Sequence, residues 1–149
     1  MRKFEFRLEA VLKVRKLKEE NCRMELGQLL VELNKIEDQI NYENKEIDNY
    51  YSLQENALKT GMAGNQLQTY SMLIDSKYIN LKLLEEEKVR QERIIEEKKQ
   101  ELAVLKGELK VMENLREKSY DEYRKALNKE IDQKVEEQTQ NWLNHKDRT

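Results

Sequence analysis

The residue types that carry enzyme chemistry are scarce in this chain of 149 residues. The only histidine is His145, in a polar stretch near the end, and the only cysteine is Cys22. No glycine-rich loop is followed by Gly-Lys-Ser or Gly-Lys-Thr, the pattern that cradles phosphates. A thiol needs a neighbouring base or metal to become reactive, so Cys22 is expected to be a buried structural thiol. The sequence therefore predicts a protein that is not an enzyme.

Two runs of carboxylates are the remaining candidates for chemistry. Residues 85–87 and 96–97 are all glutamate. Adjacent side chains on a helix point in different directions, so these runs make poor cages for Ca²⁺ or Mg²⁺. They are expected to form a solvated face, and neither a metal nor another cofactor is predicted.

The composition indicates long helices with a narrow core. Charged residues make up 39% of the chain and hydrophobic residues 38%, the mean hydropathy is -1.00, and proline is absent. Since proline breaks helices, while Glu, Lys, Leu and Gln favour them, the class is predicted to be all-α. The formal charge of -2, with both signs interspersed, argues against a nucleic-acid partner. Neither a membrane span nor a signal-peptide core is recognisable, which predicts a soluble, cytoplasmic protein without membrane insertion.

Apolar residues recur at alternating spacings of three and four along two stretches. A period of about 3.5 residues keeps one side of a helix facing a partner helix, as in a left-handed coiled coil. The first stripe comprises Leu8, Leu12, Arg15, Glu19, Cys22, Leu26, Leu29, Leu33, Ile36, Ile40, Glu43, Ile47, Tyr50, Gln54 and Ala57. The second comprises Leu67, Tyr70, Ile74, Lys77, Leu81, Leu84, Lys88, Gln91, Ile95, Lys98, Leu102, Leu105, Leu109, Met112, Arg116, Ser119 and Tyr123.

A single break separates the two stripes. Gly61 and Gly64 permit positive φ, and Asn65 is expected to cap a helix whose Gln68 reaches back to it. A break that ends one helix and starts another favours an antiparallel hairpin. The sequence predicts one domain over residues 1–149, with a helix over 4–60, a turn over 61–65, a helix over 66–142 and a polar tail over 143–149.

Closing the two arms on a turn near Met62 sets the pairing across the seam. Facing residue numbers then add up to about 125 in an antiparallel coiled coil. Opposite charges at such positions specify register more than they stabilise. The expected neighbours are Phe4 with Asp121, Glu19 with Lys106, and Glu43 with Lys82.

The second arm is longer than the first, so its end is expected to extend past the first arm from about residue 122. Apolar residues recur there at helical spacing without first-arm residues to cover them, which implies an external partner. The alternative is that they pack on the N-terminal segment, or that the last turns fray. These residues are Tyr123, Leu127, Ile131, Val135 and Trp142.

The N-terminal segment carries more apolar side chains than one seam can bury. Residues 1–16 also hold six basic and two acidic side chains. A partner with acidic and apolar walls would suit this surface, the alternatives being a frayed terminus or a dimer contact. The apolar residues are Phe4, Phe6, Leu8, Val11, Leu12 and Val14.

This segment resembles a known family. The opening Phe4-x-Phe6-x-Leu8-Glu9-x-Val11-Leu12-x-x-Arg15-x-x-x-Glu19 looks like the start of the FliJ family of flagellar type III export proteins, and Gly61 through Tyr70 is similar to its tip. The resemblance implies a non-enzymatic antiparallel coiled coil like the central stalk of rotary ATPases. It also implies that the chain binds the hexameric flagellar export ATPase and the membrane export gate at the inner membrane, and escorts export chaperones.

The resemblance suggests where these partners bind. The ATPase-facing end would consist of Phe4, Phe6, Leu8, Val11, Leu12, Arg15, Leu127, Ile131 and Val135. Five of the seven tyrosines lie between residues 42 and 78, and exposed tyrosine is common in binding surfaces. The gate-facing side would consist of Tyr42, Tyr50, Tyr51, Tyr70, Leu73 and Tyr78, of which only Tyr50 and Tyr70 fall on the stripes. Ordinary packing in a wide seam is the alternative for the tyrosines.

Two other functions fit the same heptads. A structural scaffold of cytoskeletal type would pair its seams between chains and form filaments, whereas a stalk is expected to be a monomer near 18 kDa when free. The equivalent stalk of an injectisome export system is the second alternative.

Overall fold

The computed structural model describes residues 2–61 and 63–148, and the described residues form two long helices. Helix α1 spans Glu9–Thr60 and helix α2 spans Gly64–Asp147. The chain divides into two compact units, which are Met1–Glu20 with Ala103–Thr149 (the terminal unit) and Asn21–Leu102 (the turn unit). In each unit a stretch of α1 packs against a stretch of α2. The predicted all-α fold of two paired helices, the second longer, is confirmed, while the single domain stays a prediction.

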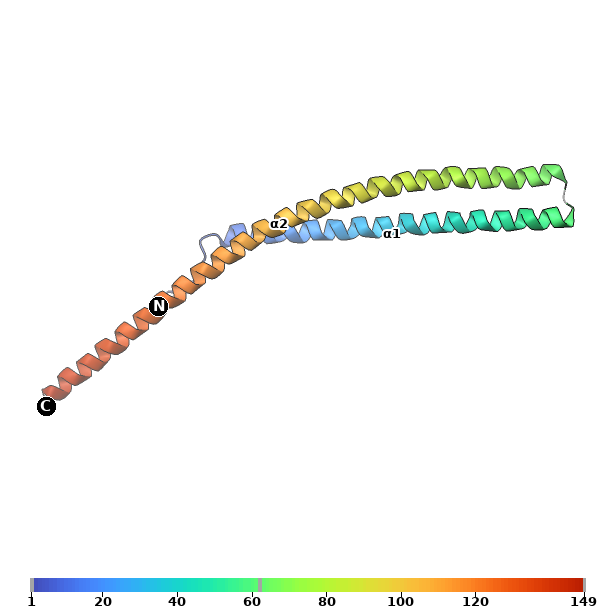
Figure 1. Ribbon diagram of the computed structural model, residues 1–149. Coiled ribbons are helices and arrows are strands. Elements are labelled where there is room, and N and C mark those ends of the chain that lie inside the picture. Colours follow the sequence, from blue (N-terminus) through green and yellow to red (C-terminus); the bar gives the residue numbers. More distant parts are fainter. Residues whose placement is uncertain (1, 62, 149) are drawn as a thin grey trace. The chain divides into compact units, whose positions relative to one another are not determined.

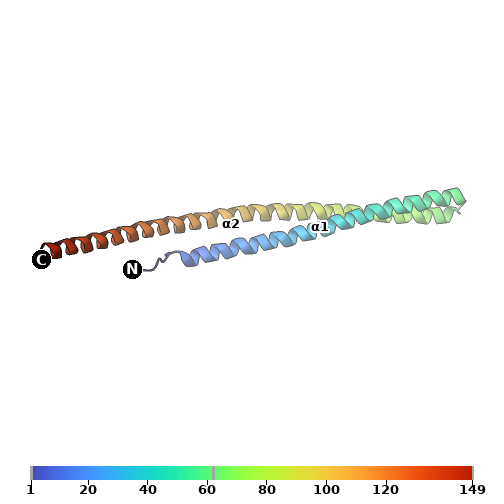
Figure 2. The ribbon, with the colours of Figure 1, turned by 90° about the horizontal axis from the view of Figure 1, so that it is seen from below.

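Contacts across the seam of the turn unit show the antiparallel course of its helices. The Gln54 side-chain amide donates a hydrogen bond to the Ser71 hydroxyl at 3.1 Å, and that of Gln91 donates to the Leu29 carbonyl at 3.2 Å. Higher numbers on α1 thus meet lower numbers on α2. The two stretches of this unit lie side by side in both views (Figure 1, Figure 2).

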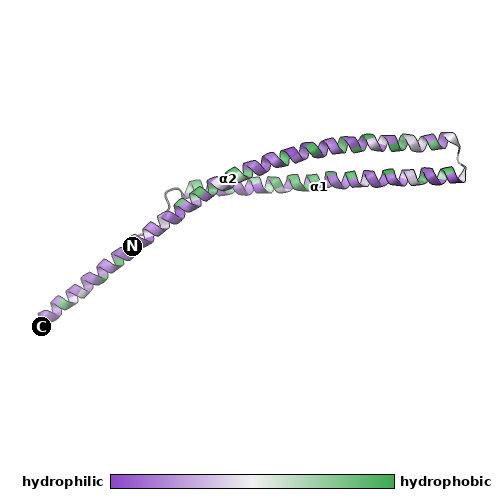
Figure 3. Ribbon diagram, in the orientation of Figure 1, coloured by the Kyte–Doolittle hydropathy of each residue, from purple (hydrophilic) through white to green (hydrophobic). Residues whose placement is uncertain are grey.

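The predicted stripes are the residues that pack between the helices. Every residue of the first stripe is buried or half-buried, and so is every residue of the second except Arg116. Apolar and hydrophilic stretches alternate along both helices, as expected when only one side of each is covered (Figure 3). The heptad prediction is therefore confirmed at the level of single residues. The most buried apolar positions are Leu12, Cys22, Ile36, Ile47, Ala57, Ile74, Ile95, Leu102 and Met112.

The connection between the helices differs from the predicted turn. Gly61 has a φ of 81°, as is usual just after a helix C-terminus, where a residue without a Cβ avoids strain. The Ala63 carbonyl accepts hydrogen bonds from the backbone N–H groups of residues 66 and 67, so Ala63 caps α2. Gly64 and Asn65 are already helical, and the prediction that Asn65 is the cap is wrong. Met62, which the predicted turn includes, lies outside the described residues.

Two helix ends also differ from the prediction. Helix α1 begins at Glu9, where the N–H of Glu9 donates to the Phe6 carbonyl at 3.1 Å, so residues 4–8 precede the helix. A carboxylate in the first turn is favourable because it faces the positive end of the helix dipole. Helix α2 continues to Asp147, so most of the predicted polar tail is helical.

Candidate docking surfaces

The N-terminal segment, residues 2–8, is not helical because its apolar residues repeat every second position. A period of two places side chains on alternate sides of an extended chain, whereas a helix requires a period near 3.6. The structure follows this alternation. Phe4, Phe6 and Leu8 are half-buried, while Lys3, Glu5 and Arg7 are exposed. This signal was present in the sequence, and the heptad prediction, which extended the helix to residue 4, missed it.

Phe4 anchors the N-terminal segment to α2 within the terminal unit. Its ring lies 5.2 Å from the Tyr120 ring, edge to face, and 5.5 Å from the Tyr123 ring. The Arg116 guanidinium lies 5.6 Å from the Phe4 centroid and is also 3.1 Å from the Glu9 carboxylate. Each aromatic pair contributes about 0.5–1.5 kcal/mol beyond the area it buries. The segment is therefore held by a small number of side-chain contacts.

The first residues of the chain extend this contact along α2. The Tyr123 hydroxyl donates a hydrogen bond to the Arg2 carbonyl. Arg2 and Tyr123 also line a shallow groove with Ala126, Leu127 and Glu130. Leu127 is half-buried, so part of the predicted overhang does pack beside the N-terminal segment, as the alternative prediction states.

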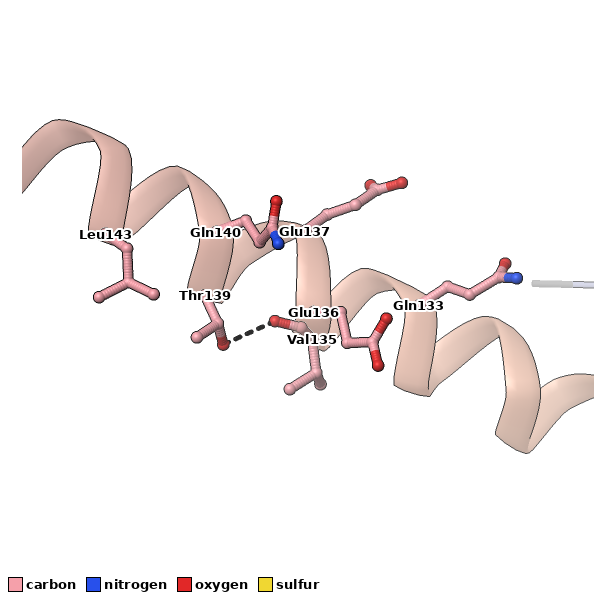
Figure 4. A pocket seen from close by; sticks show the side chains of 7 residues that line it. All are labelled: Gln133, Val135, Glu136, Glu137, Thr139, Gln140 and Leu143. Atoms are coloured by element: carbon pink, nitrogen blue, oxygen red, sulfur yellow. Dashed lines mark hydrogen bonds between the residues drawn. The ribbon is translucent and has the colours of Figure 1, made fainter.

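Beyond Leu127 the apolar side of α2 is uncovered. Ile131 is 38%, Val135 55% and Trp142 60% exposed, although they follow Leu127 at helical spacing. We call Ile131, Val135 and Trp142 the end stripe. Figure 4 shows Val135 on the same side of α2 as Leu143, with Gln133 and Gln140 on another side. The residues around them, 133–143, come from one helix, so this surface is a helix face and not an enclosed cavity.

Within the terminal unit, the residues predicted to face the ATPase fall into three groups according to their exposure. Val11, Ile131 and Val135 are exposed, and Phe4, Phe6, Leu8 and Leu127 are half-buried. The other two belong to the seam. Leu12 is buried, and the Arg15 guanidinium donates to the Glu108 carbonyl at 3.0 Å.

In the turn unit, the predicted gate-facing tyrosines that fall on the stripes are less exposed than those that do not. Tyr50 and Tyr70 are half-buried, whereas Tyr42, Tyr51, Tyr78 and Leu73 are exposed. A hydrogen bond with Tyr78 raises the pKa of Tyr51, helped by partial desolvation and by the negative charge of Asp75. Tyr51 and Tyr78 are therefore neighbours on different helices.

Tyr42 lies on the other flank of the turn unit. It precedes the stripe residue Glu43, whereas Tyr51 and Tyr78 each follow a stripe residue, which puts them on opposite sides of the seam. The Lys77 ammonium lies 5.6 Å from the Tyr42 ring centroid. Tyr42 also lines a shallow groove with Gln39, Glu43, Asn80, Leu83 and Leu84. The predicted gate-facing residues thus occupy two surfaces.

The polar stripe residues of the turn unit form ion pairs across the seam. The Lys77 ammonium lies 3.3 Å from the Glu43 carboxylate, and the Lys98 ammonium lies 2.7 Å from that of Glu25. The predicted partner of Glu43, Lys82, is exposed, and that prediction is wrong because Lys82 lies one position beyond the stripe. Glu19 is buried, and its pairing with Lys106 stays a prediction.

The Glu43–Lys77 pair has a defined pH dependence. Partial desolvation lowers the pKa of Lys77, but its hydrogen bond with Glu43 and the charges of Glu43 and Glu46 raise that pKa by more. A raised folded-state pKa stabilises the fold fully below the unfolded value of about 10.4 and ceases to do so as the pH rises through the folded value. The contribution of Lys77 is therefore lost in strong base.

Exchanging the charges of this pair tests its role. We expect Glu43→Lys and Lys77→Glu each to lower the free energy of unfolding by about 1–2 kcal/mol, because each puts two like charges at a partly buried position. The double variant should recover most of that loss. Urea unfolding followed by circular dichroism measures all four proteins. Equal stability of the single variants and the wild type would show that the pair does not hold the seam.

Two further kinds of site are absent from the described residues. Within them, neither helix has a stretch long and apolar enough to cross a membrane. Over residues 2–61 and 63–148, no group of three or more His, Cys, Asp or Glu side chains is arranged to hold a metal ion.

Comparison with known proteins adds one finding to this geometry. Searches of curated proteins and of solved structures gave no match. A family model described as "Flagellar FliJ protein" matches residues 4–144, nearly the whole chain. The match includes residues 4–8 of the N-terminal segment, all of α1, α2 as far as residue 144, and the end stripe. The chain therefore belongs to the FliJ family and is a non-enzymatic component of flagellar protein export.

Proposed function

We propose that this protein acts as a stalk-like linker that binds and activates the hexameric flagellar export ATPase and connects it to the membrane export gate. The observation that carries the proposal is the uncovered end stripe on α2. Exposed aliphatic and aromatic side chains at helical spacing are typical of a helix that lies in an apolar groove of a partner. Membership of the FliJ family favours this role over a cytoskeletal scaffold or an injectisome stalk.

Different residues of the terminal unit would have different roles in binding the ATPase. Ile131, Val135 and Val11 are exposed and would contact the ATPase directly. Phe4, Phe6 and Leu8 of the N-terminal segment would border that surface beside Leu127 of α2, and Leu12 and Arg15 would hold the seam behind it. The basic residues near the N-terminus would speed the encounter with an acidic wall.

A direct test is the rate of ATP hydrolysis by the purified hexamer. We expect this rate to rise several-fold on addition of the protein and to saturate at one chain per hexamer, as a central stalk requires. Bovine serum albumin at equal concentration controls for non-specific stabilisation. An unchanged rate at concentrations well above that of the hexamer would refute ATPase activation.

The gate-facing role would belong to the turn unit. Tyr51 and Tyr78, which adjoin each other, would form its centre, with Tyr42, Tyr50, Tyr70 and Leu73 around the two flanks. Tyrosine offers apolar area and a hydroxyl with few rotatable bonds, which suits the centre of an interface. The protein would then work in the cytoplasm at the inner-membrane export apparatus, where it could also meet export chaperones, and it would be a monomer when free.

Truncating Tyr51 and Tyr78 should impair binding to the export gate without impairing activation of the ATPase. We expect Tyr51→Ala/Tyr78→Ala to weaken capture by the cytoplasmic domain of the export gate at least about tenfold, since buried interface tyrosines are frequent hot spots. Stimulation of the ATPase should be unchanged. The matched control is Val31→Ala/Val89→Ala, which removes two exposed apolar side chains elsewhere in the turn unit. If both double variants bind the gate domain as the wild type does, the gate contact lies elsewhere.

A further inference from the structure

The N-terminal segment covers part of the apolar side of α2, and the same side is uncovered nearer the C-terminal end of the helix. Tyr120, Tyr123 and Leu127 precede Ile131 at spacings of three and four, so they lie on one side of α2 with the end stripe. Phe4 packs on the rings of Tyr120 and Tyr123, and Arg2 lies in the groove beside Leu127. The covered and uncovered parts are thus one continuous apolar surface.

We propose that residues 2–6, the strap, are a displaceable cover that competes with the ATPase for this surface. The inference rests on the proposed function and adds regulation of the same site. With the strap closed, a partner reaches Ile131 and the residues beyond it freely, but the half-buried Tyr123 and Leu127 and the ring edge of Tyr120 beside Phe4 only in part. With the strap released, the surface extends back over Leu127 and Tyr123 to Tyr120.

The contacts of the strap suit a cover that opens. Phe4 and Phe6 are half-buried, so a partner can reach them without unfolding the helices. The strap is not helical and therefore lacks the repeated backbone hydrogen bonds of a helix, and the Arg2 carbonyl is held by the side chain of Tyr123. The exposed side chains of the strap are Arg2, Lys3 and Glu5, and the exposed Arg7 follows the strap, so this stretch carries a net positive charge.

This charge identifies the partner surface that would open the strap. An apolar groove with an acidic rim would attract the basic strap away from α2 while its apolar floor takes the place of Phe4. The apparent affinity of such a partner equals its affinity for the open form multiplied by the fraction of chains that are open. Weakening the strap should therefore strengthen binding, which is the opposite of what a direct contact through Phe4 would give.

A disulfide that locks the strap tests the competition. Arg2→Cys and Ala126→Cys place thiols in the one groove that both residues line, in a Cys22→Ala background. We expect the oxidised protein to stimulate the hexameric ATPase with at least about tenfold lower apparent affinity than the reduced protein. Each single-cysteine variant, treated with the same oxidant, is the control. Equal stimulation by the oxidised and reduced forms would overturn the proposal.

Opening the strap should have the reverse effect. We expect Phe4→Ala to bind the ATPase about threefold to tenfold more tightly than the wild type, with unchanged helical content. Weaker binding by this variant would overturn the competition and assign Phe4 to the docking surface itself.

A measurement without the ATPase keeps the two proposals separate. The dye bis-ANS fluoresces on accessible apolar surface. Its emission should therefore be higher with Phe4→Ala than with the wild type, and lower with the oxidised Arg2→Cys/Ala126→Cys protein than with its reduced form. Emission equal to that of the wild type in Phe4→Ala would refute the shielding. A rise in emission without any response of the ATPase would instead refute the proposed function and leave the shielding in place.

Discussion

Replacing Ile95 with aspartate is expected to unfold the turn unit, whereas the same replacement at the adjacent Ile94 should leave it folded. Ile95 is 4% exposed and lies in the seam, while Ile94 is 45% exposed on a flank. Losing a buried isoleucine costs about 2–5 kcal/mol, and burying an unpaired carboxylate adds a further penalty. A narrow two-helix seam has few other contacts with which to compensate.

Thermal unfolding followed by circular dichroism separates the two outcomes. The free energy of unfolding should fall by at least about 4 kcal/mol in Ile95→Asp and by less than about 1 kcal/mol in Ile94→Asp. The two variants change the same residue type to the same charge one position apart. Similar losses in both would mean that the seam does not run through Ile95.

Introducing two carboxylates into the end stripe is expected to abolish capture by the export ATPase. Each of Ile131 and Val135 would contribute about 1.5–3 kcal/mol on burial, so Ile131→Asp/Val135→Asp should weaken binding at least about a hundredfold. Both side chains are exposed in the free protein, so its stability should change by less than about 1 kcal/mol. The loss would therefore concern binding alone.

The opposite side of the same helix supplies the matched control. Gln133→Asp/Gln140→Asp adds the same charge to α2 but on the side away from Val135 (Figure 4). Its binding should stay within about threefold of the wild type, as expected for positions outside the centre of an interface. Equal loss in the two double variants would point to a general effect of charge, and no loss in either would remove the end stripe from the interface.

The helix pairing could be predicted from the sequence because one physical rule decides it. Apolar residues at spacings of three and four must share a side of a helix, so residues such as Ile36, Ile74 and Leu102 could be assigned to the seam from their spacing alone. The polar members of the stripes followed the same rule. Glu43 and Lys77 both lie on a stripe, and they pair, while Lys82 lies off it.

The N-terminal segment could not be placed by that rule. Phe4 and Phe6 are two residues apart, which suits an extended chain, yet they adjoin a strong heptad stripe that begins at Leu8. What holds them is a contact with Tyr120 and Tyr123, more than a hundred positions along the sequence, and local periodicity carries no information about such a contact. The N-cap position at Ala63 was missed because alanine has no side chain that can accept a hydrogen bond from the first N–H groups of α2, whereas Asn65 has one.

The sequence indicates which residues of the candidate surfaces face outward, but not how these residues are grouped in space. Heptad counting shows which tyrosines face outward, but Tyr42 and Tyr51 separate onto two flanks only once the pairing of the helices is known. Likewise, the overhang was expected to begin near residue 122, whereas the strap covers α2 as far as Leu127. Both differences arise from contacts between distant parts of the chain.

The most direct test of the account observes the end stripe itself during binding. Trp142 is the only tryptophan of the chain, so 5-fluorotryptophan labelling gives a single ¹⁹F resonance from within the uncovered surface. On addition of the unlabelled export ATPase hexamer, that resonance should shift and broaden in a saturable manner, and Ile131→Asp/Val135→Asp should prevent the change. A resonance that stays unchanged while the hexamer's ATP turnover rises would show that activation does not occur through the end of α2.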